Sequence, residues 1–165
     1  MKITAIFLVV ISMLSGCATG GGNVFLKKDF STPLGKYTAA VVKVDAGNYP
    51  ASIAETENFR VYFTSMLGKY NVFNDIVSEE DAKTMKSVVR LKCVVAEYNK
   101  IDDIQRFVIG SMAGKSSIKI DVEVVDMKTK ETIGIVEASG ITAGPMKRAV
   151  EKAAELAAQE LSGLK

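Results

Sequence analysis

Residues 117–124 alternate strictly between polar and apolar side chains, and this segment constrains the fold more than any other part of the chain. A period of two residues is typical of a β-strand that has one face buried and the other in water. We therefore expect an amphipathic strand here. Its buried face would consist of Ile118, Ile120, Val122 and Val124.

The remaining pattern predicts a mixture of strands and helices. Strands are expected at 37–44, 72–77 and 88–98, and at 131–139 as the hairpin partner of 117–124. Apolar residues at helical spacing predict a helix from Ser52 to about Leu67, where Ser52 and Glu55 have the spacing of a capping box. The acidic residues after Ser78 suit the first turn of a short helix, and Gly144-Pro145 marks the start of the last long helix.

The order of these elements, β-α-β-(α)-β-β-β-α, restricts the topology. A right-handed crossover would make the first two strands parallel. The last three strands would form an antiparallel meander. Because each main helix has a single apolar stripe, both helices can cover the same face of the sheet. The predicted fold class is therefore α+β: a two-layer sandwich with a mixed sheet of about five strands and the two main helices on one face.

Composition excludes several kinds of function. The 165 residues allow one modest domain, and the absence of His removes imidazole bases, His-containing triads and His metal ligands. A net charge of +2 gives no case for nucleic-acid binding. Residues 110–116 lack the glycine spacing of a phosphate-binding loop, and a strand rather than a helix follows them. We expect no nucleotide, cofactor, metal site or enzymatic activity.

The N-terminal residues have the features of a secretion signal. Lys2 precedes an apolar run over 3–13, which is too short to span a bilayer and is typical of a signal-peptide core. The following Leu14-Ser15-Gly16-Cys17 resembles the lipobox of bacterial lipoproteins. The resemblance implies cleavage between Gly16 and Cys17, a diacylglycerol on the Cys17 sulfur and a fatty acid such as palmitate on its new amino group. Ala18, in place of Asp, implies the periplasmic face of the outer membrane.

This resemblance sets the expected domain organisation. Residues 1–16 are the lipoprotein signal peptide, residues 17–36 the lipidated Cys17 and a flexible glycine-containing tether, and residues 37–165 a single α+β periplasmic domain. A tether of that length would reach about 24 Å on average. Four apolar residues of the tether are unusual for a linker, and docking on the domain, binding of a partner and contact with the membrane interface all stay open for them: Val24, Phe25, Leu26 and Phe30. With Cys17 carrying lipid, Cys93 has no partner for an intramolecular disulfide, and its alternation with Leu91 and Val95 predicts a buried small hydrophobe.

Residues 99–115 form a long connection between two strands that a few residues could join. Long connections inside compact domains are often functional. Three interpretations stay open: the strands extend into this segment, it forms an apolar contact loop for a partner protein, or it touches the membrane. The candidate partner-loop residues are Ile104, Arg106, Phe107, Val108, Ile109 and Met112.

The run 106–110, Gly114, the strand 118–126 and the Lys128-Thr129-Lys130 turn together resemble a domain family of unknown function found in bacterial lipoproteins. Lys130 stands where glycine is usual in that family. The element order is also similar to that of the TolB amino-terminal domain and of CsgG-like and LpoB-like periplasmic domains. The resemblance implies a fold used for protein contact in the cell envelope, and no catalytic residue comes with it.

These observations lead to one expected function and an alternative. We expect a lipid-anchored cell-envelope lipoprotein that acts as a non-enzymatic protein-interaction or assembly module. Its partners would be the membrane, through the anchor, and another envelope protein. The alternative is a carrier of a small apolar ligand or a regulator of a cell-wall enzyme. A carrier would require a cavity of several hundred Å³ between the helices and the sheet.

Overall fold

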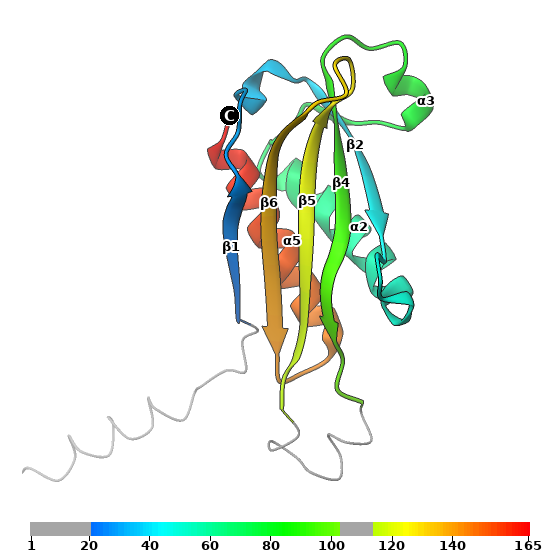
Figure 1. Ribbon diagram of the computed structural model, residues 1–165, viewed down its shortest axis with the longest axis vertical. Helices are drawn as coiled ribbons and strands as arrows, with labels where there is room; N and C mark the ends of the chain where they lie inside the picture. The colour runs from blue at the N-terminus through cyan, green and yellow to red at the C-terminus, as the bar shows by residue number, and fades with distance from the viewer. Residues whose placement is uncertain (1–20, 103–113) are drawn as a thin grey trace, which may run out of the picture.

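The computed structural model describes residues 21–102 and 114–165, which form a six-stranded mixed sheet with two long helices on one face (Figure 1). The sheet order is β1-β6-β5-β4-β2-β3. The strands are β1 (Gly21–Lys28), β2 (Ala39–Asp45), β3 (Asp75–Ile76), β4 (Val88–Asn99), β5 (Ser116–Asp126) and β6 (Thr132–Thr142). The helices are α2 (Ile53–Lys69), α3 (Glu79–Ala82) and α5 (Met146–Gly163), and short 3-10 turns lie at η1 (Leu34–Lys36) and η2 (Pro50–Ser52).

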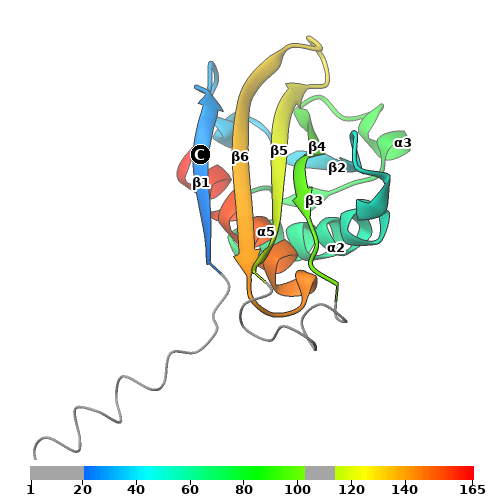
Figure 2. The same ribbon diagram turned by 60° about the horizontal axis from the view of Figure 1, so that its bottom comes forward.

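The strand pairing confirms the predicted topology. Strand β2 lies between β3 and β4 and is parallel to both, so the chain crosses over through α2. Strands β4, β5 and β6 form the expected antiparallel meander. Helices α2 and α5 lie next to each other on the same face of the sheet (Figure 2). The α+β layout is therefore confirmed, with one more strand than expected.

The additional strand is β1, which the sequence analysis assigned to the flexible tether. Residues 21–28 pair antiparallel with β6, from Gly21 opposite Ile141 to Lys28 opposite Ile135. Val24 and Leu26 pack against the core, and Leu34 farther along is fully buried. The tether prediction is wrong for these residues because the free edge of β6 supplies hydrogen-bond partners that the segment alone lacks.

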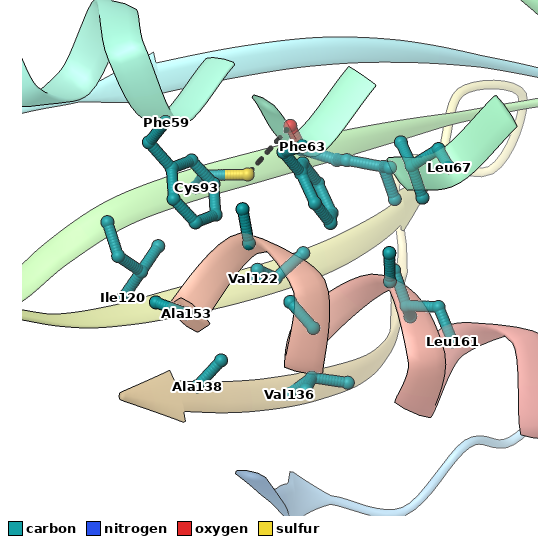
Figure 3. Packing of buried hydrophobic residues seen from close by; sticks show 14 of the residues in the cluster. Phe59, Phe63, Leu67, Cys93, Ile120, Val122, Val136, Ala138, Ala153 and Leu161 are labelled. Carbon is teal, nitrogen blue, oxygen red and sulfur yellow. Dashed lines mark hydrogen bonds between the residues drawn. The ribbon is translucent and has the colours of Figure 1, made fainter. Parts of the chain in front are cut away.

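The core lies between the helices and the sheet and is closely packed (Figure 3). In α2, the Phe59 and Phe63 rings stack with their centroids 5.1 Å apart. In α5, a face of alanines lets the helix approach the strands closely. The labelled core side chains are Phe59, Phe63, Leu67, Cys93, Ile120, Val122, Val136, Ala138, Ala153 and Leu161.

The alternation of residues 117–124 is confirmed, with Ile118, Ile120, Val122 and Val124 all at most 1% exposed. The opposite face of the sheet, which we call the open face, carries charged residues. Helix α3 lies on the open face at the β2 side, where Ala82 packs with Ala39, Val41 and Val88 in a second small apolar cluster. The main core therefore covers one face of the sheet, while the open face has this small apolar cluster beside its charged residues.

The two predicted helix starts differ in outcome. The predicted capping box at Ser52 is not formed, since the Ser52 hydroxyl donates to the Tyr49 carbonyl at 2.7 Å and makes no cap hydrogen bond. Ser52 ends the η2 turn, and its φ of −90° and ψ of 4° differ from the extended geometry that a capping serine adopts. Ser78 does have extended geometry, and its hydroxyl accepts a hydrogen bond from the Asp81 N–H at 3.1 Å.

Gly140 of β6 sits against the backbone of α5, and this contact yields a prediction. A Cβ at Gly140 would lie 1.8 Å from the Ala149 carbonyl oxygen, so Gly140→Ala must push the helix off the sheet. We expect Gly140→Ala to lower the free energy of unfolding by about 2 kcal/mol or more, measured by urea denaturation.

The matched control is Gly68→Ala in α2, where an added Cβ meets nothing within 4 Å. Alanine has the higher helix propensity, so this variant should be more stable than the parent by about 0.5–1 kcal/mol. An unchanged urea midpoint for Gly140→Ala would contradict the close contact.

Candidate interaction site

Strand register defines two ends of the sheet. Gly21 lies opposite Ile141, Ser116 lies opposite Thr142, and Asn99 lies opposite Ser117. These positions make up what we call the Gly21 end, at the bottom of Figure 1. The β5–β6 turn and α3 lie at the other end, which we call the turn end (Figure 1). The two ends offer different surfaces to a partner.

The predicted partner-loop residues Ile104, Arg106, Phe107, Val108, Ile109 and Met112 lie outside the described residues, as do Gly16 and Cys17. The described residues next to that segment, 100–102 and 114–115, are not in strands. Strand β4 ends at Asn99 and β5 begins at Ser116, so the strands do not extend through these flanks. The described residues on both sides of segment 103–113 therefore lie at the Gly21 end.

Both flanks of segment 103–113 are held by polar contacts. The Lys100 ammonium lies 3.2 Å from the Glu55 carboxylate, whose side chain is only 8% exposed. The Ile101 N–H donates to the Ser116 hydroxyl at 3.0 Å. Burial raises the pKa of nearby Tyr98 to about 12, and the negative charge of Glu55 adds to that effect. These contacts fix the positions from which the segment leaves and re-enters the sheet.

The open face is covered by ion pairs between neighbouring strands. The Lys27 ammonium contacts the Asp121 and Glu137 carboxylates at 2.8 and 3.1 Å, and the hydrogen bond to Asp121 is the main reason why the pKa of Lys27 is raised. Lys119 pairs with Glu97 at 2.5 Å. Paired charges of this kind neutralise much of the charge on a sheet face in water.

Glu79 attaches α3 to the open face. Its two carboxylate oxygens lie 2.7 Å from the Lys43 ammonium and 2.6 Å from the Arg90 guanidinium. The hydrogen bond from Lys43 is the largest cause of the lowered pKa of Glu79. The acidic residues after Ser78 thus have a structural role in positioning α3 beside the β2 side of the sheet.

Cys93 is fully buried in the core, so the prediction of a small hydrophobe is confirmed. Burial raises the pKa of its thiol well above the ordinary range, which keeps the thiol protonated and unreactive.

In residues 21–102 and 114–165, no three His, Cys, Asp or Glu side chains converge as a metal site requires. No helix within these same ranges combines the length and the apolar character needed to cross a bilayer.

At the turn end, Asp126 organises the β5–β6 turn. Its carboxylate accepts hydrogen bonds from the Tyr37 hydroxyl at 2.7 Å and from the N–H groups of Lys128 and Thr129 at 2.7 and 3.0 Å. Burial alone would raise the pKa of Asp126, but these hydrogen bonds outweigh it and lower the pKa. Lys130 completes the turn with a φ of 65°, a left-handed conformation that glycine adopts more easily.

A cavity of about 690 Å³ opens beside this turn. It lies between the α3–β4 connection and the β5–β6 turn. Its lining combines the lysines Lys83, Lys86, Lys128 and Lys130 with apolar residues that include Met85, Val88 and Met127. The sequence analysis missed this cavity because its lysines belong to two segments far apart in the chain, and only the fold brings them together.

The family can now be identified. Residues 56–144 match the model of the family described as Domain of unknown function (DUF4410), and the protein belongs to that family. This match confirms the expected family of unknown function. The likeness to the TolB amino-terminal domain and to CsgG-like and LpoB-like domains stays a prediction. A comparison with curated proteins finds no match.

Solved structures share the fold at low sequence identity. The PelC dodecamer from Paraburkholderia phytofirmans aligns with a TM-score of 0.59 and 13% identity, covering 86% of this chain and 98% of that one. A single-residue variant of the same dodecamer aligns with a TM-score of 0.56 at the same identity and coverage. At this identity the likeness shows the fold alone.

The Tyr37–Asp126 hydrogen bond predicts a dependence of stability on alkaline pH. Burial, followed by the bond to Asp126, raises the pKa of Tyr37 from 10.0 to about 12. The contribution of Tyr37 is therefore complete below pH 10 and is lost as the pH rises towards 12. Tyr37→Phe should lower the free energy of unfolding by about 1 kcal/mol at neutral pH, through loss of the hydrogen bond.

Denaturant titrations at neutral and alkaline pH, measured by circular dichroism, provide the test. The difference in stability between the parent and Tyr37→Phe should shrink as the pH rises from 10 to 12. Tyr49→Phe is the control and should follow the parent throughout. A constant difference across this range would show that Tyr37 does not supply the effect.

Proposed function

We propose that this protein is a lipid-anchored lipoprotein of the outer membrane, facing the periplasm, and that it acts as a non-enzymatic protein-interaction or assembly module. One spacing carries the proposal. The lipobox-like Cys17 precedes Gly21, the first residue of β1, by only four positions. Four residues span at most about 14 Å when fully extended. The anchor would therefore hold the Gly21 end close to the bilayer.

This short link changes the expected position of the domain. A tether of the predicted length would let the domain stand clear of the membrane, but residues 21–28 belong to the sheet. The flanks of segment 103–113 lie at the same end, on Asn99 and Ser116. The proposal therefore places the loop's partner in the membrane or at its surface, which favours the two contact interpretations of that loop.

Two observations support assembly rather than catalysis. The free edge of β1 exposes backbone hydrogen-bonding groups, and Phe25 on that strand is 49% exposed. The protein also shares its fold with PelC, which forms a dodecamer, and this supports self-association as one form of assembly. The shifted pKa values described above arise from ion pairs, from the turn at Asp126 and from buried Tyr and Cys side chains, rather than from convergent acids in a cleft.

The carrier alternative is less well supported. It needs space between the helices and the sheet, where the α5 backbone instead meets Gly140 directly and the alanines of α5 are fully buried. A regulator of a cell-wall enzyme would itself be a protein-contact module. The partner experiment below would therefore recover such an enzyme.

The anchor is tested by Cys17→Ser. We expect this variant to keep residues 1–16, to carry no lipid and to leave the detergent-rich phase, because the serine oxygen cannot form the thioether. Mass spectrometry of the N-terminus and phase separation measure the outcome. Cys93→Ala is the control and should be processed like the parent. An unmodified N-terminus at residue 17 in the parent would contradict the proposal.

The loop is tested by deleting residues 104–112 and crosslinking intact envelopes. We expect the deletion to remove partners that the parent protein recovers, while circular dichroism shows an unchanged fold. Gly68→Ala in α2 serves as the control for an alteration outside the loop. If the recovered partners are the same with and without the loop, the loop is not the contact site.

A further inference from the structure

Fewer of the lysines at the turn end form close ion pairs than on the open face. Lys27, Lys92 and Lys119 on the open face each lie within ion-pair distance of a carboxylate. Of the cavity lysines, Lys83 pairs with Glu80 at 2.7 Å, and both side chains are largely exposed. Among the described residues, no carboxylate forms an ion pair with the other three cavity lysines, which are Lys86, Lys128 and Lys130.

Three acidic residues lie near the cavity lysines in the chain: Asp81, Asp126 and Glu131. Asp126 accepts hydrogen bonds from Tyr37 and from the turn backbone. Asp81 accepts a hydrogen bond from the Ser78 hydroxyl at 2.6 Å. The charge of Lys128 contributes to the lowered pKa of Asp126, and Glu131 directly follows Lys130. Neither carboxylate lines the cavity, whose described lining holds four lysines and no acidic side chain.

The cavity also has an apolar component. Met127 packs against the small cluster that contains Val88, and Met85 is 37% exposed. Methionine side chains are flexible and polarisable, and surfaces that contain them adapt to varied apolar groups. A volume of about 690 Å³ is sufficient for several side chains of a bound segment.

Lys130 provides an independent observation. It lines the cavity and adopts a φ of 65°. A side chain at positive φ is strained, and glycine would form the same turn at lower conformational cost. Strain that is retained at one position points to a use for the side chain found there. Here, that side chain belongs to the lining of the cavity.

The position of the cavity restricts its ligand. It lies at the opposite end of β5 from Ser117, and Asp126 is nine positions farther along the extended strand than Ser117. That length is about 30 Å, several times the Debye length at physiological salt. If the anchor holds the Gly21 end at the bilayer, the headgroups of that membrane are too distant to neutralise the cavity lysines.

From these observations we infer that the turn-end cavity binds an acidic, partly apolar peptide segment of another envelope protein. Carboxylates of the segment pair with Lys86, Lys128 and Lys130, and its apolar side chains contact Met85 and Met127. The choice of a peptide over a lipid rests on the proposed function, which sets the orientation. The cavity chemistry itself does not depend on the anchor.

The probe is a fluorescent peptide of repeated Glu-Glu-Leu units, with a Gln-Gln-Leu peptide as its uncharged match, bound to the purified full-length mature protein. Anisotropy should show tighter binding of the acidic peptide, weakened by added salt.

The protein variants test the lysines directly. The double variant Lys86→Gln with Lys128→Gln should lower the affinity for the acidic peptide about tenfold. Lys92→Gln, which removes a paired lysine of the open face, should bind like the parent. Equal binding of the two peptides, or parent-like binding by the double variant, overturns the proposal.

Lys130→Gly separates charge from folding. It should raise the melting temperature or leave it unchanged, because glycine relieves the strained turn, and yet weaken binding of the acidic peptide severalfold. Weak binding together with a lowered melting temperature would show that Lys130 stabilises the turn, and it would contradict a separate role for its charge in binding.

A second experiment measures binding of the same protein and variants to anionic phosphatidylglycerol vesicles. Vesicle binding that needs the same lysines and exceeds peptide binding would identify a lipid headgroup as the ligand and overturn the peptide. If mass spectrometry finds no lipid on Cys17 of the parent protein isolated from its envelope, while that protein still binds the peptide, the proposed function is wrong and the cavity assignment stands.

Discussion

The contact between α5 and the sheet determines how the rest of this protein is arranged. Gly140 has no side chain, and the α5 face that meets it is built from alanines, so helix and strand approach to backbone distance. Such an interface cannot admit a ligand, and it fixes the face on which the apolar residues of β4, β5 and β6 must lie. The other face of every strand is then left to water and charge.

That division explains where function can reside. On the open face, cross-strand carboxylates and lysines neutralise one another, and α3 is attached by Glu79. Two regions that stay available for contacts lie at the ends of the sheet. The Gly21 end leads to the proposed anchor and to segment 103–113, and the turn end holds the cationic cavity. Under the proposed function, one end would face the membrane while the other binds a protein.

Sequence alone predicted the elements whose signal is local. The alternation in β5 and the apolar stripe of α5 specify their faces directly, and the crossover rule supplies the parallel pairing. Strand β1 was missed because glycines dilute its alternation and its stability depends on β6, more than a hundred residues away. The predicted capping box at Ser52 does not form, because Ser52 is the last residue of the η2 turn and its hydroxyl donates to the Tyr49 carbonyl instead. The sequence alone could not predict the cavity, because Lys86 and Lys128 line the same cavity only in the folded protein.

Strand β1 is both the edge of the sheet and the direct continuation of the segment that bears Cys17. A partner held at the turn end while the anchor stays in the bilayer would pull β1 along its own length. The backbone hydrogen bonds between β1 and β6 run across that direction, so they would be loaded in shear together instead of being opened one after another. If Cys17 carries the proposed anchor, the geometry that shortens the tether thus also protects the edge of the sheet from being unfolded by a pull on its first strand.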